Sequence, residues 1–174
     1  MVQASEILAK IKRGEAVRYD GVIIEGDLDL SELDLPIKHV ERTWEDINDG
    51  LTEAVKLVES SILIKDSEIR GDVNLRNIVF QNKSSFNGAT LTKKGQFSGA
   101  IFSGVVAFKE TIFIGDADFE GAKFSGDANF EGAKFASEAD FVTAKFNGET
   151  KFREVQFCGK AYFSLSQFSG KDKT

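Results

Sequence analysis

The sequence has little of the chemistry on which most enzymes and secreted domains depend. Its 174 residues include one cysteine, Cys158, one histidine, His39, and one proline, Pro36. A single cysteine excludes an internal disulfide framework and favours a reducing compartment. No apolar run approaches the ~20 residues of a membrane span, and residues 1–10 lack the basic and apolar regions of a secretory signal. We therefore expect a cytoplasmic protein without a membrane partner.

Acidic charge is concentrated in the first half of the chain. Residues 1–79 carry 17 acidic and 10 basic side chains, a net of −7, and residues 80–174 carry 11 and 12, a net of +1, which sum to −6. The negative charge and the lack of a basic stripe argue against a nucleic-acid partner. Hydrophobic residues make up 41% of the chain, enough for one sizeable core.

Phenylalanine is abundant, and its spacing is the main structural signal. From Phe97 onward the steps between successive phenylalanines alternate between five and six residues, so the repeat unit has 11 residues. This spacing cannot keep one face of an α-helix buried, whereas a short repeat with frequent turns indicates a β-solenoid. The core ladder expected from this spacing contains all 16 phenylalanines: Phe80, Phe86, Phe97, Phe102, Phe108, Phe113, Phe119, Phe124, Phe130, Phe135, Phe141, Phe146, Phe152, Phe157, Phe163 and Phe168.

A second periodic position supports strands. Two residues before most phenylalanines the side chain is small, and the residue between the two is polar. In extended backbone, residues i and i−2 point to the same side. Each side of the solenoid is therefore expected to direct one large and one small residue inward. The triplets that show this best are Ala117-Asp118-Phe119, Ala128-Asn129-Phe130 and Ala139-Asp140-Phe141.

These triplets resemble the pentapeptide-repeat family, whose pattern is a small residue, Asp or Asn, Leu or Phe, and two variable positions. The resemblance covers at least residues 78–168 and implies a right-handed quadrilateral β-helix with one repeat per side. The chain departs from the pattern by one inserted residue in every second repeat, so two units of 11 make a coil of 22 residues. We expect a bulge or wider corner at the insertions, namely at Asp116, Asp127, Glu138 and Glu149.

We expect one all-β solenoid domain over residues 1–174. Ser5 is the expected N-cap of a capping helix, Thr43 that of a short helix in an excursion, and residues 52–57 are a second helix candidate. Val17, Val22, Leu28 and Leu33 have the spacing of a first coil. The expected parts are a capping helix at 1–14, a first coil at 15–35, an excursion at 36–57, regular coils at 58–168 and a polar tail at 169–174.

The sequence offers no convincing catalytic, cofactor or metal site. His39 has no nucleophile motif around it, and Cys158 follows an inward Phe and should point outward, without a basic cluster to activate it. Four carboxylates of the first coil are either a cation site or, as alternating coil residues more often are, a solvated face: Asp27, Asp29, Glu32 and Asp34. We therefore expect no enzyme activity and no cofactor.

Outward apolar residues indicate a surface for contact. Ile112 and Ile114 flank Phe113, and Val105 and Ile101 lie outward on earlier sides. Val105, Ile112 and Ile114 form a candidate interaction patch. The alternative is that these outward residues pack under a loop such as the 36–57 excursion.

We expect a non-enzymatic interaction or scaffold module with an unknown protein partner. Little follows Phe168, so either a second copy covers the last coil, giving a homodimer, or the chain is part of a longer protein. The alternative, suggested by the family resemblance, is a DNA mimic that inhibits a topoisomerase such as gyrase. Mimicry requires acidic stripes, whereas Lys123 and Lys145 alternate with Asp118 and Asp140.

Overall fold

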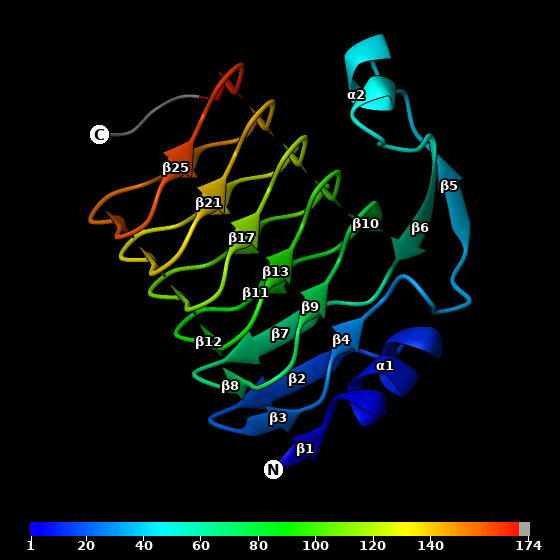
Figure 1. Ribbon diagram of the computed structural model, residues 1–174. Coiled ribbons are helices and arrows are strands. Elements are labelled where there is room, and N and C mark those ends of the chain that lie inside the picture. Colours follow the sequence, from blue (N-terminus) through cyan, green and yellow to red (C-terminus); the bar gives the residue numbers. More distant parts are fainter. Residues whose placement is uncertain (171–174) are drawn as a thin grey trace.

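Short parallel strands wind around one axis in four-sided coils (Figure 1). The structure is a computed structural model that describes residues 1–170, so the last four residues of the expected polar tail lie outside the described part. Phe80 pairs with Phe102, and Phe102 with Phe124, so equivalent residues of neighbouring coils are 22 positions apart. The predicted four-sided β-solenoid with 22-residue coils is confirmed.

The first two sides of each coil form two parallel sheets. Side 1 contains β2 (Val17–Asp20), β7 (Ile62–Lys65), β11 (Ser84–Ser85), β15 (Val106–Ala107), β19 (Ala128–Asn129) and β23 (Thr150–Lys151). Side 2 contains β1 (Val2–Gln3), β3 (Ile23–Glu25), β8 (Glu68–Ile69), β12 (Thr90–Leu91), β16 (Ile112–Phe113), β20 (Lys134–Phe135) and β24 (Gln156–Phe157).

The other two sides complete the circuit. Side 3 contains β4 (Leu28–Asp29), β9 (Val73–Asn74), β13 (Gly95–Gln96), β17 (Ala117–Asp118), β21 (Ala139–Asp140) and β25 (Ala161–Tyr162). Side 4 contains β5 (Ile37–His39), β6 (Ala54–Val58), β10 (Ile78–Phe80), β14 (Ile101–Phe102), β18 (Lys123–Phe124), β22 (Lys145–Phe146) and β26 (Gln167–Phe168).

The core consists of four columns of stacked side chains, one for each side. On side 3 the ring centroids of Phe97, Phe119, Phe141 and Phe163 follow one another at 4.5, 4.8 and 5.0 Å, with nearly parallel rings. Rings of different columns meet edge to face, as Phe119 and Phe130 do at 5.7 Å. Both arrangements are favourable for aromatic quadrupoles, so the rings both fill the interior and fix its register.

The alternation of five and six residues corresponds to two kinds of corner. Five-residue corners place the second residue after the Phe at positive φ, as at Gly121 (61°) and Thr143 (55°). Six-residue corners use an acidic side chain: Asp127 Oδ1 accepts a hydrogen bond from the Glu149 N–H of the next coil at 2.9 Å. Strand pairing keeps its offset of 22 residues across these corners. The inserted residue therefore widens the corner and does not form a ladder bulge.

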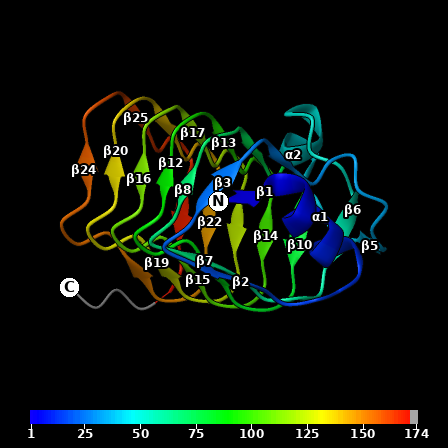
Figure 2. The ribbon, with the colours of Figure 1, turned by 90° about the horizontal axis from the view of Figure 1, so that it is seen from below.

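The N-terminal end of the core is closed by α1 (Ala4–Lys12), which lies next to β2 and β4 (Figure 2). Ile7 and Ile11 are buried against the first coil. The expected N-cap at Ser5 is wrong: the helix begins at Ala4 and its N-cap is Gln3, because β1 pairs with β3 up to Gln3 and leads directly into the helix.

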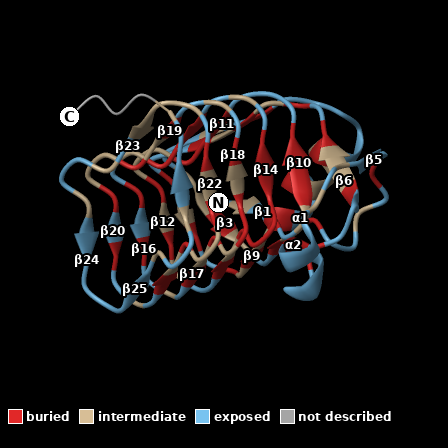
Figure 3. Cartoon of the chain, turned by 90° about the horizontal axis from the view of Figure 1, so that it is seen from above, coloured by how far each residue is buried: buried red, intermediate tan, exposed pale blue. Residues whose placement is uncertain are grey.

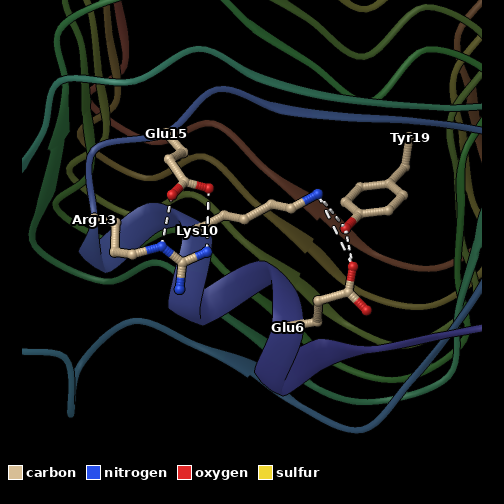
Figure 4. A network of polar contacts seen from close by, with 5 residues as sticks. All are labelled: Glu6, Lys10, Arg13, Glu15 and Tyr19. Atoms are coloured by element: carbon tan, nitrogen blue, oxygen red, sulfur yellow. Dashed lines mark hydrogen bonds and ion pairs between the residues drawn. The ribbon is translucent and has the colours of Figure 1, made fainter.

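A polar network ties this helix to the first coil (Figure 4). The Lys10 Nζ donates to the Tyr19 hydroxyl at 2.8 Å, and that hydroxyl donates to Glu6 Oε1 at 2.8 Å. The hydrogen bond to Tyr19, supported by the charges of Glu6 and Glu15, raises the pKa of Lys10 above its usual value. Tyr19 thus joins the helix to side 1.

The first coil uses a different frame from the expected one. Tyr19 pairs with Ile64 and Ile24 with Ile69, so Tyr19 and Ile24 occupy the positions that phenylalanine fills later. Val17 pairs with Ile62 and takes the smaller inward position two residues earlier. The expected first coil is therefore present, and the four residues named for it occupy the smaller inward position, two residues before the ring position: Val17, Val22, Leu28 and Leu33.

The excursion is inserted between the third and fourth sides of the first coil. It leaves through β5, passes through α2 (Trp44–Asn48) and returns through β6, which is antiparallel to β5 and supplies the fourth side. The expected N-cap at Thr43 is confirmed. The expected helix at 52–57 is wrong, because residues 54–58 form β6 and pair with β10.

Candidate interaction surfaces

The phenylalanine ladder is buried from Phe80 to Phe146, and its last four members are partly or largely exposed. Figure 3 shows the exposed strand β24 in the last coil. Phe135 and Phe146 are fully buried, whereas Phe157 and Phe168, one coil later in the same columns, are 37% and 55% exposed. The last coil also exposes Leu165 and Tyr162. Since stacking on the next coil is what buries each ring, one face of the last ring layer has no ring stacked on it within residues 1–170.

The uncovered end has a shallow cavity and free strand edges. The cavity has a volume of about 230 Å³. Within residues 1–170, β23, β24, β25 and β26 are the last strands of their sheets, so each keeps one unpaired edge. The cavity is lined by Phe146, Gly148, Thr150, Phe152, Phe168 and Gly170.

The three residues of the expected patch are exposed but do not adjoin along one face. Val105 is 45%, Ile112 38% and Ile114 48% exposed. Val105 lies at the corner between sides 4 and 1, Ile112 lies on side 2, and Ile114 follows it at the corner towards side 3. The geometry thus offers Ile112 and Ile114 as one small apolar site, separate from Val105.

Ile101, in contrast, is buried under the excursion, as the alternative for these outward residues predicted. Together with Val55 and Val79 it forms a small buried cluster on the outer face of side 4, against which Val40 and Leu57 pack. The outward column runs from Val79 to Ile101, Lys123 and Lys145. It changes from apolar to charged after Ile101, and Lys145 meets the Asp46 carboxylate of α2.

An acidic cavity of about 290 Å³ lies on side 3. Burial, with the charges of Asp140, Asp118 and Asp49, raises the pKa of Glu120. Burial and Asp118 likewise raise the pKa of Asp140, despite a hydrogen bond from the Val142 N–H. The carboxylates in the lining are Asp116, Asp118, Glu120, Glu138 and Asp140, and the cations are Arg76 and Lys94.

Several of these carboxylates have a structural role. Asp118 Oδ1 accepts the Glu120 N–H at 2.9 Å, and Asp140 Oδ1 accepts the Val142 N–H at 2.8 Å. Such turns explain the Asp or Asn before Phe in the repeat, because the short side chain satisfies a corner amide. Among residues 1–170 no group of three or more His, Cys, Asp or Glu is arranged to hold a metal ion.

The remaining candidates do not converge. His39 lies on β5 and Cys158 on the last coil, both exposed and on different parts of the solenoid. Asp27 accepts the Asp72 N–H and Asp29 the Ser31 N–H, each at 2.8 Å, so these two carboxylates bind backbone amides.

The excursion holds α2 firmly against the coils. Thr43 and Asp46 form a capping box, and Asp46 forms an ion pair with Lys145 at 3.6 Å. Arg42 donates to the Gly99 carbonyl at 2.6 Å and to the Thr52 carbonyl at 3.2 Å. Burial alone would raise the pKa of Asp46, but the hydrogen bonds from Thr43 and the charges of Lys145 and Arg42 lower it below its usual value.

Leu51 provides the apolar part of this attachment. It is buried, and a Cβ at Gly121 would lie 2.5 Å from its Cδ1 and one at Gly99 would lie 2.6 Å from its Cδ2. Both glycines also have positive φ. A side chain at either corner would displace Leu51, so the excursion packs on these two glycine corners.

The outer face of α2 carries apolar side chains that the sequence analysis did not single out. Trp44 is 75% and Ile47 42% exposed, and they lie three positions apart, which makes them neighbours on one helix face. The opposite face borders a groove of about 820 Å³ between α2 and the last two coils. The signal in the sequence was the capping box, Thr43 to Asp46, around an apolar Trp44.

No helix among residues 1–170 is long and apolar enough to cross a membrane.

The comparisons with known proteins identify the repeat. A family model described as pentapeptide repeats (9 copies) matches residues 97–144. No curated protein and no solved structure matches the chain. Coils on both sides of the matched region keep its register, since Phe80 pairs with Phe102 and Phe146 with Phe168. Residues 97–144 are therefore pentapeptide repeats, and the same solenoid continues on both sides of them.

Proposed function

We propose that this solenoid is a non-enzymatic interaction module that self-associates through its last coil. The observation that carries the proposal is the exposure of Phe157 and Phe168 in columns whose earlier members are fully buried. A second ring layer stacked on this face would remove apolar surface from water at about 25 cal/mol per Å². It would also give the free strand edges partners.

The two ends of the solenoid favour a closed dimer over a filament. The N-terminal end is covered by α1, whose Ile7 and Ile11 are buried, so the last coil of one copy has no open first coil to stack on. Two last coils can meet only face to face, around a two-fold axis. Such an isologous interface is closed and self-limiting, and it sets the strands of the two copies antiparallel.

The test is the mass in solution. We expect light scattering at high micromolar concentration to give twice the chain mass of 19.1 kDa, and Phe168→Glu to give the monomer with an unchanged circular dichroism spectrum. The matched control is Ile114→Glu, since Ile114 is about as exposed as Phe168 but lies on a corner of an inner coil. A monomeric wild-type protein would refute the self-association.

DNA mimicry is the second candidate, and the acidic cavity on side 3 is the observation that favours it. Asp118 and Asp140 follow each other along this side. Duplex DNA, however, carries a charge every ~1.7 Å, whereas successive coils are spaced by about 4.8 Å. Lys123 and Lys145 also form a parallel basic column on the adjoining side 4. Inhibition of gyrase supercoiling at low micromolar protein, lost in Asp118→Lys, would reverse this ranking.

A further inference from the structure

We infer that the outer face of α2 is a docking site for a protein partner with an apolar pocket framed by lysine and arginine. The inference extends the proposed interaction role to a second surface, on the opposite side of α2 from the groove that borders the last coil. Its anchors are Trp44 and Ile47. Two exposed carboxylates lie on this side: Glu53, which lines a hollow together with Ile47, and Glu41, which follows Val40, whose N–H donates to the Glu53 carbonyl.

The helix faces the opposite way from an ordinary surface helix. An amphipathic helix normally turns its apolar residues to the core and its charges to solvent. In α2 the charged and polar residues Glu45, Asp46 and Asn48 border the groove, whereas Trp44 and Ile47 point away from it. Figure 1 shows α2 standing out from the row of coils.

The attachment of the excursion does not use these two side chains. Leu51, Arg42 and the Asp46–Lys145 pair hold the segment, and the capping box fixes the start of the helix. Trp44 and Ile47 are therefore displayed on a preorganised support, so a partner loses little conformational entropy in ordering them. Tryptophan in particular is enriched among the residues that dominate binding energy.

The charges around the anchors define the partner. Glu41 and Glu53 form no ion pair within the described part of the chain, and Arg42 is turned inward to two carbonyl groups. Two uncompensated negative charges beside an apolar centre complement a basic rim. They also oppose an anionic membrane surface, to which basic and not acidic helices bind.

The experiment uses Trp44 as its own reporter, because it is the single tryptophan of the chain. The probe is a synthetic amphipathic peptide of lysine and leucine, compared with a glutamate–leucine peptide of the same pattern. We expect a saturable blue shift of Trp44 emission with the basic peptide only. By calorimetry, we expect Trp44→Ala and Ile47→Ala to weaken binding about tenfold or more, and the double variant Glu41→Lys/Glu53→Lys to weaken it with a reduced salt dependence.

Two controls separate this surface from others. Ile37→Ala removes a comparably exposed apolar side chain and should bind the basic peptide as the wild type does, and so should Glu138→Gln in the acidic cavity. Binding that is unaffected by Trp44→Ala, or equal binding of the acidic peptide, would overturn the inference. A change of solution mass in Trp44→Ala would assign the face to a second copy, and a blue shift with phosphatidylcholine vesicles would assign it to a membrane; both outcomes overturn it.

The α2 docking site and the self-association through the last coil can be tested independently. The titration is repeated on Phe168→Glu, in which the proposed self-association is removed and α2 is unchanged. Peptide binding by a monomer would support the α2 site and leave it independent of the dimer. If neither the wild type nor Phe168→Glu binds the peptide, the α2 site is refuted and the self-association is unaffected. The self-association is tested only by the mass measurement.

Discussion

Truncation of one central ring measures how much the aromatic columns contribute to stability. Phe130 is fully buried. It stacks on Phe108 at 5.1 Å and on Phe152 at 5.0 Å, and it meets three further rings edge to face. Phe130→Ala leaves a cavity between stacked coils that the flanking β-ladders keep from closing.

The expected loss follows from these contacts. Phe→Ala in a packed core costs about 3–5 kcal/mol, and each aromatic pair contributes about 0.5–1.5 kcal/mol beyond its area. With two stacked and three edge-to-face partners, and Phe135 as a sixth, tilted neighbour, Phe130 belongs in the upper part of that range, at about 4–5 kcal/mol. Phe168→Ala, in a ring that is 55% exposed, should cost about 1–2 kcal/mol when measured on the dilute monomer.

The assay is urea unfolding followed by far-ultraviolet circular dichroism, with the slope of the transition compared between variants. An unchanged slope assigns a lower midpoint to lost stability and not to a changed unfolded state. A loss below about 1 kcal/mol for Phe130→Ala, or equal losses at Phe130 and Phe168, would refute the reasoning that stacked columns hold the coils together.

Three further predictions concern corners and charges. Thr143→Gly should raise stability by about 1 kcal/mol, because a β-branched residue is strained at a φ of 55°; a lower urea midpoint would contradict this. Burial and neighbouring carboxylates raise the pKa of Glu120, so stability should increase as pH falls through that raised value. Glu120→Gln should raise the midpoint at neutral pH and reduce that increase, with the raised pKa of Asp140 giving the remainder. The lowered pKa of Asp46 has the opposite sign: its contribution is present above the usual aspartate range and lost as pH falls through the lowered value. An acid transition of Trp44 fluorescence that is absent in Asp46→Asn would show this, and an identical transition in both proteins would exclude it.

The regular coils could be predicted because each repeat contrasts a large with a small inward residue. At Ala128 and Phe130 the size difference fixes which of the two positions is the ring column. The first coil lacks that contrast, since Val17 and Tyr19 are both large and both lie on one side of the strand. Because side chains on a strand alternate with a period of two, the pattern does not show which of residues i and i−2 belongs to the ring column. The predicted frame of the first coil was therefore two residues too early.

The excursion could be predicted only in part, for a related reason. Thr43 and Asp46 are close in sequence, and their capping box is a local signal. The direction in which α2 faces depends on Arg42 reaching the carbonyl of Gly99, 57 residues away. Likewise, residues 54–58 are a strand because they pair with β10. Such long-range contacts override local propensity, and the surface at Trp44 therefore required the structure.

The most direct test of the account is the rise of the chain per 22 residues. Asn74, Gln96, Asp118, Asp140 and Tyr162 follow one another in the outward column of side 3. Spin labels at Asn74→Cys and Tyr162→Cys, in a Cys158→Ser background diluted with unlabelled protein, lie four coils apart. Four steps of about 4.8 Å predict a narrow backbone separation of about 19 Å between residues distant in sequence. A broad distribution, or a separation that does not shorten by about 4.8 Å when the first label moves to Gln96, would contradict the stacked coils on which every other conclusion depends.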